Sequence, residues 1–297
     1  MTFLTIFTAP KPFTNPHINI IQRNAIRSWQ FLGDDVEVMV FGDEPGIAEN
    51  AIELGVRHIP KVARNDKGTP LLNDIFAKVH DLSQSPVLAY ANADILLMAD
   101  FLKASKIIHA RSRNFLIVGR RWNLDIHEEL DFSPGWENEV RTQIHKKGEL
   151  FIPLGIDYFI FPRHLYAELP PFAVGRPAWD NWMIYEGYSR GYDLIDATHG
   201  ITAVHQNHDY HHLPGEKPHY TTEEAKTNLA LAGGPRQIYN ILDAKLEYVD
   251  EKIRSARFSR IRFVRALERR FQTNQGSGLR WFIASRLKRL QRRWNFQ

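Results

Sequence analysis

Residues 87–94 read VLAYANAD, an apolar run of five residues that stops at Asn92-Ala93-Asp94. The run follows a proline and has the length and composition of a fully buried β-strand. In open α/β sheets, ligands bind at the carboxyl ends of the strands. Two oxygen-bearing side chains at such an end, two residues apart, can hold Mg²⁺ or Mn²⁺ against a diphosphate. Asn and Asp are also favoured in turns that end strands, so both interpretations stay open at this point.

The segments on either side of this run alternate between strand and helix patterns. Asn15-Pro16 predicts a helix start, and apolar residues at helical spacing continue to about Leu32. Thr69-Pro70 predicts a second helix start of the same kind. The other expected strands are 3–8, 36–41, 56–59 and 115–119. Strands alternating with helices over the first 120 residues indicate an α/β fold with a mostly parallel sheet and helices on both faces.

Composition and charge divide the chain into a body and a tail. Residues 252–297 contain 14 Lys and Arg and one acidic residue, Glu268, which gives this segment a net charge of +13. Because the whole chain has a net charge of +4, residues 1–251 have a net charge of −9. We therefore expect a domain over 1–250, with halves 1–120 and 121–250, and a basic helical tail over 251–297. The absence of cysteine excludes disulfides and thiolate metal sites, and no apolar run is long enough to span a bilayer. The first residues do not resemble a signal peptide, so the cytoplasm is the expected location, and an acidic body makes nucleic acid an unexpected partner.

A histidine-rich segment forms a second candidate site. Residues 205–219 read HQNHDYHHLPGEKPH and contain five of the chain's 13 histidines. His and Asp side chains are suitable metal ligands, and Lys217 can act as a point charge on a phosphate. The alternatives are a zinc site, although the HExxH spacing is missing, or a solvated polar loop.

The third candidate is Trp179-Asp180-Asn181-Trp182, at the start of an expected helix over 180–190. Sugar rings stack their apolar faces on aromatic side chains, and a carboxylate between two such walls can act as a general base toward an acceptor hydroxyl. Asp180 can instead be an N-cap. Asp157, which opens an expected strand over 155–163, is a further candidate: it either binds acceptor hydroxyls or ends a turn.

Together these residues resemble the nucleotide-diphospho-sugar transferases of GT-A fold, the broad group that includes bacterial family 2-like glycosyltransferases. The resemblance covers approximately residues 1–235. It implies a GT-A (Rossmann-like) sheet and a hexosyltransferase-like enzyme that moves a sugar from a nucleotide-diphosphate sugar to an acceptor hydroxyl, in cell-surface glycan or glycolipid synthesis. It also places Thr8, Ala9 and Pro10 beside the base and ribose of the donor.

The family's Asp-x-Asp metal motif maps onto Asn92-Ala93-Asp94, where the first Asp has become Asn. Asn92 still offers a carbonyl oxygen to the metal or the ribose, with one negative charge fewer. Asp94 would bind Mn²⁺ or Mg²⁺ together with a late histidine, for which the resemblance offers His205, His208 and His212. Metal independence, with Lys217 or an arginine carrying the charge, stays an alternative.

The resemblance also implies how transfer proceeds. Asp180 matches the base of inverting GT-A enzymes at a helix start, and Trp179 and Trp182 would then flank the acceptor. A likeness of residues 212–218 to a family 8 element favours the retaining route instead, so the stereochemical outcome stays open.

The tail, residues 278–297, forms an amphipathic pattern with Trp281 and Trp294 near its ends and arginines mostly off the apolar stripe. Such a helix suits the headgroup layer of an anionic membrane, where each basic residue contributes about 1 kcal/mol. We expect peripheral attachment to the cytoplasmic face and a glycan or lipid-linked acceptor. The alternatives are packing on the acidic body or on another protomer, and nucleic-acid binding.

Three other functions compete with glycosyl transfer. A sugar nucleotidyltransferase would need a glycine-rich loop after the first strand, where this chain has residues 8–12, TAPKP. A His/Asp metal-dependent phosphoesterase would need several carboxylates near the histidines. A non-catalytic membrane-docking scaffold is favoured by Asn92.

Overall fold

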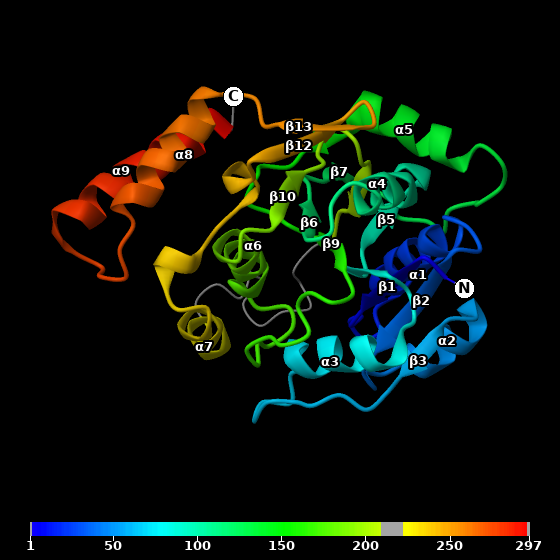
Figure 1. Cartoon of the computed structure of the whole chain (residues 1–297). Helices are drawn as coiled ribbons and strands as arrows, with labels where there is room; N and C mark the ends of the chain where they lie inside the picture. Colours follow the sequence, from blue (N-terminus) through cyan, green and yellow to red (C-terminus); the bar gives the residue numbers. More distant parts are fainter. Residues whose placement is uncertain (1, 209–221, 296–297) are drawn as a thin grey trace.

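The computed structural model describes residues 2–208 and 222–295 and shows an α/β molecule built on one large sheet (Figure 1). The strand order is β13-β12-β10-β6-β9-β4-β1-β2-β3. Most neighbouring strands are parallel, but β9 runs antiparallel to β4 and β6, and β13 runs antiparallel to β12. The strands are β1 (Leu4–Thr8), β2 (Val36–Phe41), β3 (Arg57–Ile59), β4 (Val87–Ala91), β6 (Phe115–Val118), β9 (Tyr158–Pro162), β10 (Asp193–Asp196), β12 (Leu246–Val249) and β13 (Lys252–Ser255). The predicted α/β class with a mostly parallel sheet is confirmed.

A smaller sheet begins where β4 ends. Its order is β5-β11-β7-β8, and β5 follows β4 directly after the Asn92–Asp94 turn. Its strands are β5 (Ile95–Leu97), β7 (Trp122–Leu124), β8 (Glu149–Leu150) and β11 (Ala203–Gln206). The antiparallel pairing of β11 with β5 places His205 opposite Ile95, beside the carboxyl end of β4. This pairing joins two sequence regions more than 100 residues apart.

Helices cover both faces of the large sheet (Figure 1). Side chains alternate along a strand, so Leu4 and Ile6 pack with α1, α2 and α4, whereas Phe7 packs with α3 and α6. The buried Trp29 indole donates to the carbonyl of Ile95 at 2.9 Å, which satisfies its only polar group. The helices are α1 (Pro16–Gln30), α2 (Ile47–Leu54), α3 (Leu72–Leu82), α4 (Ala99–His109), α5 (Trp136–Lys147), α6 (Trp179–Ser189), α7 (Glu223–Leu231), α8 (Arg260–Phe271) and α9 (Gly278–Asn295), with 3₁₀ turns η1 (Pro235–Gln237) and η2 (Ile241–Asp243).

One of the two predicted helix starts is confirmed. The Asn15 side chain accepts from the backbone of His17 at 2.9 Å and of Ile18 at 3.1 Å, with Pro16 at the first helical position. The start at Thr69-Pro70 is wrong, because α3 begins only at Leu72 and has no side-chain cap. The Thr69 hydroxyl donates to Glu224 at 2.6 Å, so it is used by a distant contact.

The large sheet continues past the expected end of the body. Strands β12 and β13 form a hairpin whose turn residues, Asp250 and Glu251, have φ of 50° and 59°. Such left-handed turns match the twist of hairpin strands, but Asn or Gly usually occupies them. The 250/251 boundary therefore falls inside this turn, and the last strand ends at Ser255.

Beyond the sheet, α8 and α9 lie side by side as a helical hairpin at one end of the molecule (Figure 1). Side chains of α8 contact the η2 segment and the end of β10. Within residues 2–208 and 222–295, no helix is both long enough and apolar enough to cross a lipid bilayer.

Candidate active site

A cavity of about 790 Å³ opens at the carboxyl ends of β1 and β4, where the fold class predicts a ligand site. The loop after β1 contributes Ala9 and Pro10 to its wall, and the turn after β4 contributes Asn92 and Asp94. The other predicted residues in the wall are Asp157, Trp179, Asp180, His205 and His208. The fold therefore brings together candidates that lie in five separate parts of the sequence.

Asp94 is held by the small sheet. Its backbone carbonyl accepts from the Gln206 backbone at 3.1 Å and from the Gln206 side chain at 3.3 Å. Gln206 is fully buried, and its side chain also donates to the carbonyl of Ile21. The position of Asp94 is thus fixed by β11, the strand that carries His205.

Asp94, His205 and His208 form a cluster able to hold a metal ion. The Asp94 Oδ2 atom lies 3.2 Å from His208 Nε2 and 3.8 Å from His205 Nε2, and their ligand atoms lie within 4.8 Å of one another. Among the described residues, the buried Asp94 Oδ1 atom has no hydrogen-bond partner. One carboxylate oxygen with two imidazole nitrogens is a donor set that can hold a divalent metal ion such as Mn²⁺ or Zn²⁺.

Electrostatics keep the Asp94 carboxyl of this cluster ionised. Burial opposes the charge of Asp94, but His205, His208 and Lys11 outweigh burial and hold the pKa of its carboxyl well below the ordinary value. Burial also lowers the pKa of His205, which favours the neutral imidazole. Lys11 lies in the same cavity, with its Nζ atom 3.1 Å from His208 Nε2.

Asn92 is hydrogen-bonded to Asp157. Its side-chain amide donates to Asp157 Oδ1 at 2.9 Å, and Arg121 forms an ion pair with Asp157 Oδ2. A carboxylate at position 92 would face the Asp157 carboxylate, so asparagine removes a repulsion between like charges. Both Asp157 oxygens already contact the protein, and the role predicted for Asp157 in acceptor binding stays a prediction.

Asp180 lies in the first turn of α6, with Ala178 as the N-cap residue at φ 89°. The capping interpretation of Asp180 is therefore wrong. Its buried Oδ1 atom has no hydrogen-bond partner among the described residues. Burial, with Asp157 adding to it, raises the pKa of Asp180 to about 6. A carboxylate with a pKa near neutrality suits a general base.

The two predicted tryptophan walls lie in different environments. Trp179 is in the cavity wall and packs against Tyr90 and Phe159 at ring-centre distances of 5.0 and 5.2 Å. Trp182, one turn further along α6, is a core residue that packs on Phe172 at 5.4 Å. The structure does not bring Trp182 to the cavity, because the helical turn directs it into the layer beneath.

Three other predicted site residues are not among the described residues that line the cavity. Thr8 is fully buried at the end of β1 and is absent from the cavity lining. Lys217 and His212 lie outside the described residues, so their predicted roles stay predictions.

Sequence reasoning missed the basic residues of the wall. Lys11 and Arg121 follow β1 and β6 closely, and a charged residue just after a buried strand is a signal that could have revealed them. Arg176 is held by Glu224 at 2.8 Å. The tail adds three further cations, for which the local sequence holds no signal: Arg265, Lys288 and Arg292.

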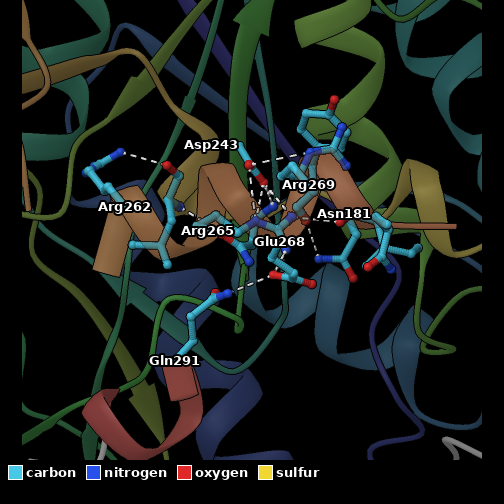
Figure 2. A network of polar contacts seen from close by, with 12 residues as sticks. Asn181, Asp243, Arg262, Arg265, Glu268, Arg269 and Gln291 are labelled. Carbon is cyan, nitrogen blue, oxygen red and sulfur yellow. Dashed lines mark hydrogen bonds and ion pairs between the residues drawn. The ribbon is translucent and has the colours of Figure 1, made fainter. Parts of the chain in front are cut away.

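The tail reaches the cavity because it docks on the body through buried ion pairs (Figure 2). Arg265 pairs with Asp243 at 2.6 Å and with Glu268 at 2.8 Å, and Gln291 of α9 donates to Glu268 at 2.8 Å. Burial opposes the charge of Arg265, but Asp243 and Glu268 outweigh it and raise the pKa of the guanidinium. In a second contact, Arg262 pairs with Asp196 at 2.7 Å. Packing of the tail on the body is thus observed.

Comparison with known proteins gives fold-level likeness only. No protein-family profile matches the chain, and a search of curated proteins found no match. Among solved structures, glucosyl-3-phosphoglycerate synthase of Mycobacterium tuberculosis is similar with TM-score 0.48 and 15% identity, over 79% of this chain and 81% of that chain. The same enzyme crystallised with Mn²⁺, UDP and phosphoglyceric acid gives TM-score 0.48 and 14% identity, over 87% of each chain. At these scores the likeness decides nothing about the chemistry of this chain.

Proposed function

We propose that the chain is a GT-A type glycosyltransferase that moves a sugar from a nucleotide-diphosphate sugar to an acceptor hydroxyl. One observation carries the proposal. A cation-binding cluster (Asp94, His205 and His208) and a buried carboxylate of raised pKa (Asp180) share one cavity at the carboxyl ends of β1 and β4. A cation held by the first group can stabilise a diphosphate leaving group, and the carboxylate can take a proton from a hydroxyl nucleophile.

The donor end of the cavity combines the loop after β1 with the metal cluster. Ala9 and Pro10 provide an apolar surface for the base and ribose, and Asn92 offers its carbonyl oxygen. Lys11 contributes a positive charge to the donor diphosphate. Mn²⁺ or Mg²⁺, when bound, neutralises the charge that develops on the departing nucleoside diphosphate.

The acceptor hydroxyl attacks the anomeric carbon from the face opposite the diphosphate. The carbon–oxygen bond to the diphosphate breaks as the new glycosidic bond forms. Asp180, which lines the cavity, takes the hydroxyl proton. Trp179 supplies an apolar face against which the acceptor sugar or chain can stack. This scheme inverts the configuration at the anomeric carbon.

Asp94→Asn is the variant that tests the donor site. It keeps the shape of the side chain but removes the charge, so Mn²⁺-dependent binding of the nucleoside diphosphate should weaken by about 100-fold. The measurement is calorimetric titration of UDP, GDP, CDP and ADP with and without Mn²⁺. Asp66→Asn, in an exposed loop, makes the same change and should bind as the wild type does.

Each outcome of this titration has a meaning. Binding of one nucleotide that needs both Mn²⁺ and Asp94 supports the metal-assisted donor site. Nucleotide binding that is equally tight with and without Mn²⁺ is consistent with the transferase proposal, and Lys11 and neighbouring arginines then neutralise the charge of the diphosphate. If the wild type binds no nucleoside diphosphate at all, the glycosyltransferase proposal is rejected.

We further propose peripheral attachment to the cytoplasmic face of an anionic membrane, in synthesis of a cell-surface glycan or glycolipid. The support is the start of α9, where Leu279, Trp281 and Phe282 are 75%, 42% and 50% exposed beside arginines.

The double variant Trp281→Glu/Phe282→Glu should lower binding to phosphatidylglycerol vesicles by about tenfold, because two apolar anchors are lost. Cosedimentation measures this loss. Ile52→Glu, which changes an apolar side chain 83% exposed on α2, is the control. Equal sedimentation of all the proteins would reject membrane attachment through α9.

A further inference from the structure

The side of α9 that faces the body carries two cations. Ala284 and Gln291 are each only 5% exposed, and they mark the docked side of this helix. Lys288 and Arg292 lie one turn apart beside them, and both line the 790 Å³ cavity. All four of these cationic side chains are exposed, but Arg289 and Arg293, on the same two turns, do not line the cavity. The helix thus directs one cationic pair toward the cavity and the other away from it.

The cavity pair, Lys288 and Arg292, differs from three arginines of the wall because neither member forms a direct ion pair with a described carboxylate. The neighbouring ion pairs are Arg121–Asp157, Arg176–Glu224 and Arg265–Asp243. Within the described part of the chain, no carboxylate lies within ion-pair distance of Lys288 or Arg292. Glu268 attracts Lys288 from further away, but its carboxylate is already paired with Arg265. Two positive charges therefore remain at the cavity wall without a direct ion pair among these residues, and an anionic ligand would provide one.

The tail that carries these cations contacts the segment next to Asp180. Arg265 of α8 donates to the carbonyl of Ile238 at 2.9 Å, and Asn181 donates to the carbonyl of Tyr239 at 2.6 Å. The short segment 238–240 therefore joins the tail to the first turn of α6, which carries Asp180. The metal cluster, in contrast, comes from the β4–β5 turn and β11.

We infer that the acceptor carries an anionic group, a carboxylate or a phosphate, that Lys288 and Arg292 bind while its hydroxyl faces Asp180. The inference rests on the proposed transferase function and specifies its acceptor class. Arg292 offers a planar fork that matches either anion, and Lys288 adds a point charge. The anionic group takes no part in bond making; it orients the acceptor. The acceptor is then either a soluble acid or a lipid whose headgroup carries the same anion.

The test uses the full chain with UDP and Mn²⁺ at saturating concentration, so that the donor site is filled. Inorganic phosphate and acetate are the soluble probes, titrated calorimetrically, and phosphatidylglycerol vesicles are the lipid probe. The double variant Lys288→Gln/Arg292→Gln should weaken binding of the preferred probe by about 100-fold, roughly tenfold for each charge. Arg289→Gln/Arg293→Gln removes the same charge from the same helix and should bind the soluble probes as the wild type does. On vesicles both double variants lose the same general attraction to anionic lipid, so the difference between them reports the cavity pair.

The outcomes distinguish a soluble anion from a lipid headgroup, and they distinguish failure of this inference from failure of the transferase proposal. Weaker binding of phosphate or acetate by the cavity double variant than by the control double variant indicates a soluble acidic acceptor. Weaker binding of vesicles by the cavity double variant than by the control, with binding of the soluble probes unchanged, indicates a lipid headgroup. Equal binding by the two double variants, or no probe binding by a wild type that binds UDP, overturns the inference and leaves the transferase proposal standing. A wild type that fails to bind UDP rejects the transferase, whatever the probes show.

Discussion

Asp180→Asn is expected to lower the turnover number for sugar transfer by about 1,000-fold, because a positioned general base contributes about 10²–10⁴-fold. The amide keeps the shape of the carboxylate but cannot take the acceptor proton. Binding of the nucleoside diphosphate should stay within a factor of two, since Asp94 and the loop after β1 are unchanged. Steady-state kinetics and nucleotide titration of the same preparation measure both quantities. A turnover number within threefold of the wild type would exclude Asp180 as the base.

The pH dependence follows from the same residue. Its pKa is raised to about 6, so the carboxylate that accepts a proton predominates above that pH. Turnover should fall tenfold for each pH unit below about 6 and level off above it. The Asn variant should lack this limb.

The raised pKa also disfavours the charged form in the folded state. Stability from this group is fully present below pH 3.8 and is lost as pH rises through about 6. At pH 8 the Asn variant should therefore be no less stable than the wild type, which separates lost chemistry from lost folding.

The second large effect is expected from Arg265→Ala in the docked tail. Removing the guanidinium leaves Asp243 and Glu268 without their buried partner, at side-chain exposures of 7% and 2%. Breaking a buried ion pair in this way costs about 3–5 kcal/mol. Denaturant unfolding, with limited proteolysis of the α8–α9 hairpin, measures the loss.

The matched control for this variant is Arg270→Ala, an exposed arginine on the same helix. Its free energy of unfolding should change by no more than about 0.5 kcal/mol. If both alanine variants were equally stable, the network in Figure 2 would not be what holds the tail on the body.

The parts of the fold that were predictable are those determined by local pattern. The apolar runs at 3–8, 36–41, 87–91 and 115–119 are found as β1, β2, β4 and β6, because buried strands need nearly continuous apolar sequence. The Asn15 cap likewise depends on neighbouring residues. Asn92 and Asp94 could be placed at the cavity because they directly follow one of these strands.

What the sequence could not reveal depends on contacts between distant residues. Trp179 and Trp182 have the same local context, yet packing on Phe172 withdraws only Trp182 from the cavity. In the tail, Lys288 and Arg292 cannot be distinguished by pattern from Arg289 and Arg293. Only docking through Arg265, more than 20 residues away in sequence, decides which pair reaches the cavity.

The hydrogen bond from Asn92 to Asp157 has an evolutionary consequence. In a chain with aspartate at position 92, that carboxylate would face the Asp157 carboxylate and repel it. Substitutions at the two positions should therefore occur together. Homologues with aspartate at 92 are expected to carry an uncharged residue at 157. Introducing Asn92→Asp alone should then be deleterious, and adding Asp157→Asn should restore function, the signature of reciprocal epistasis.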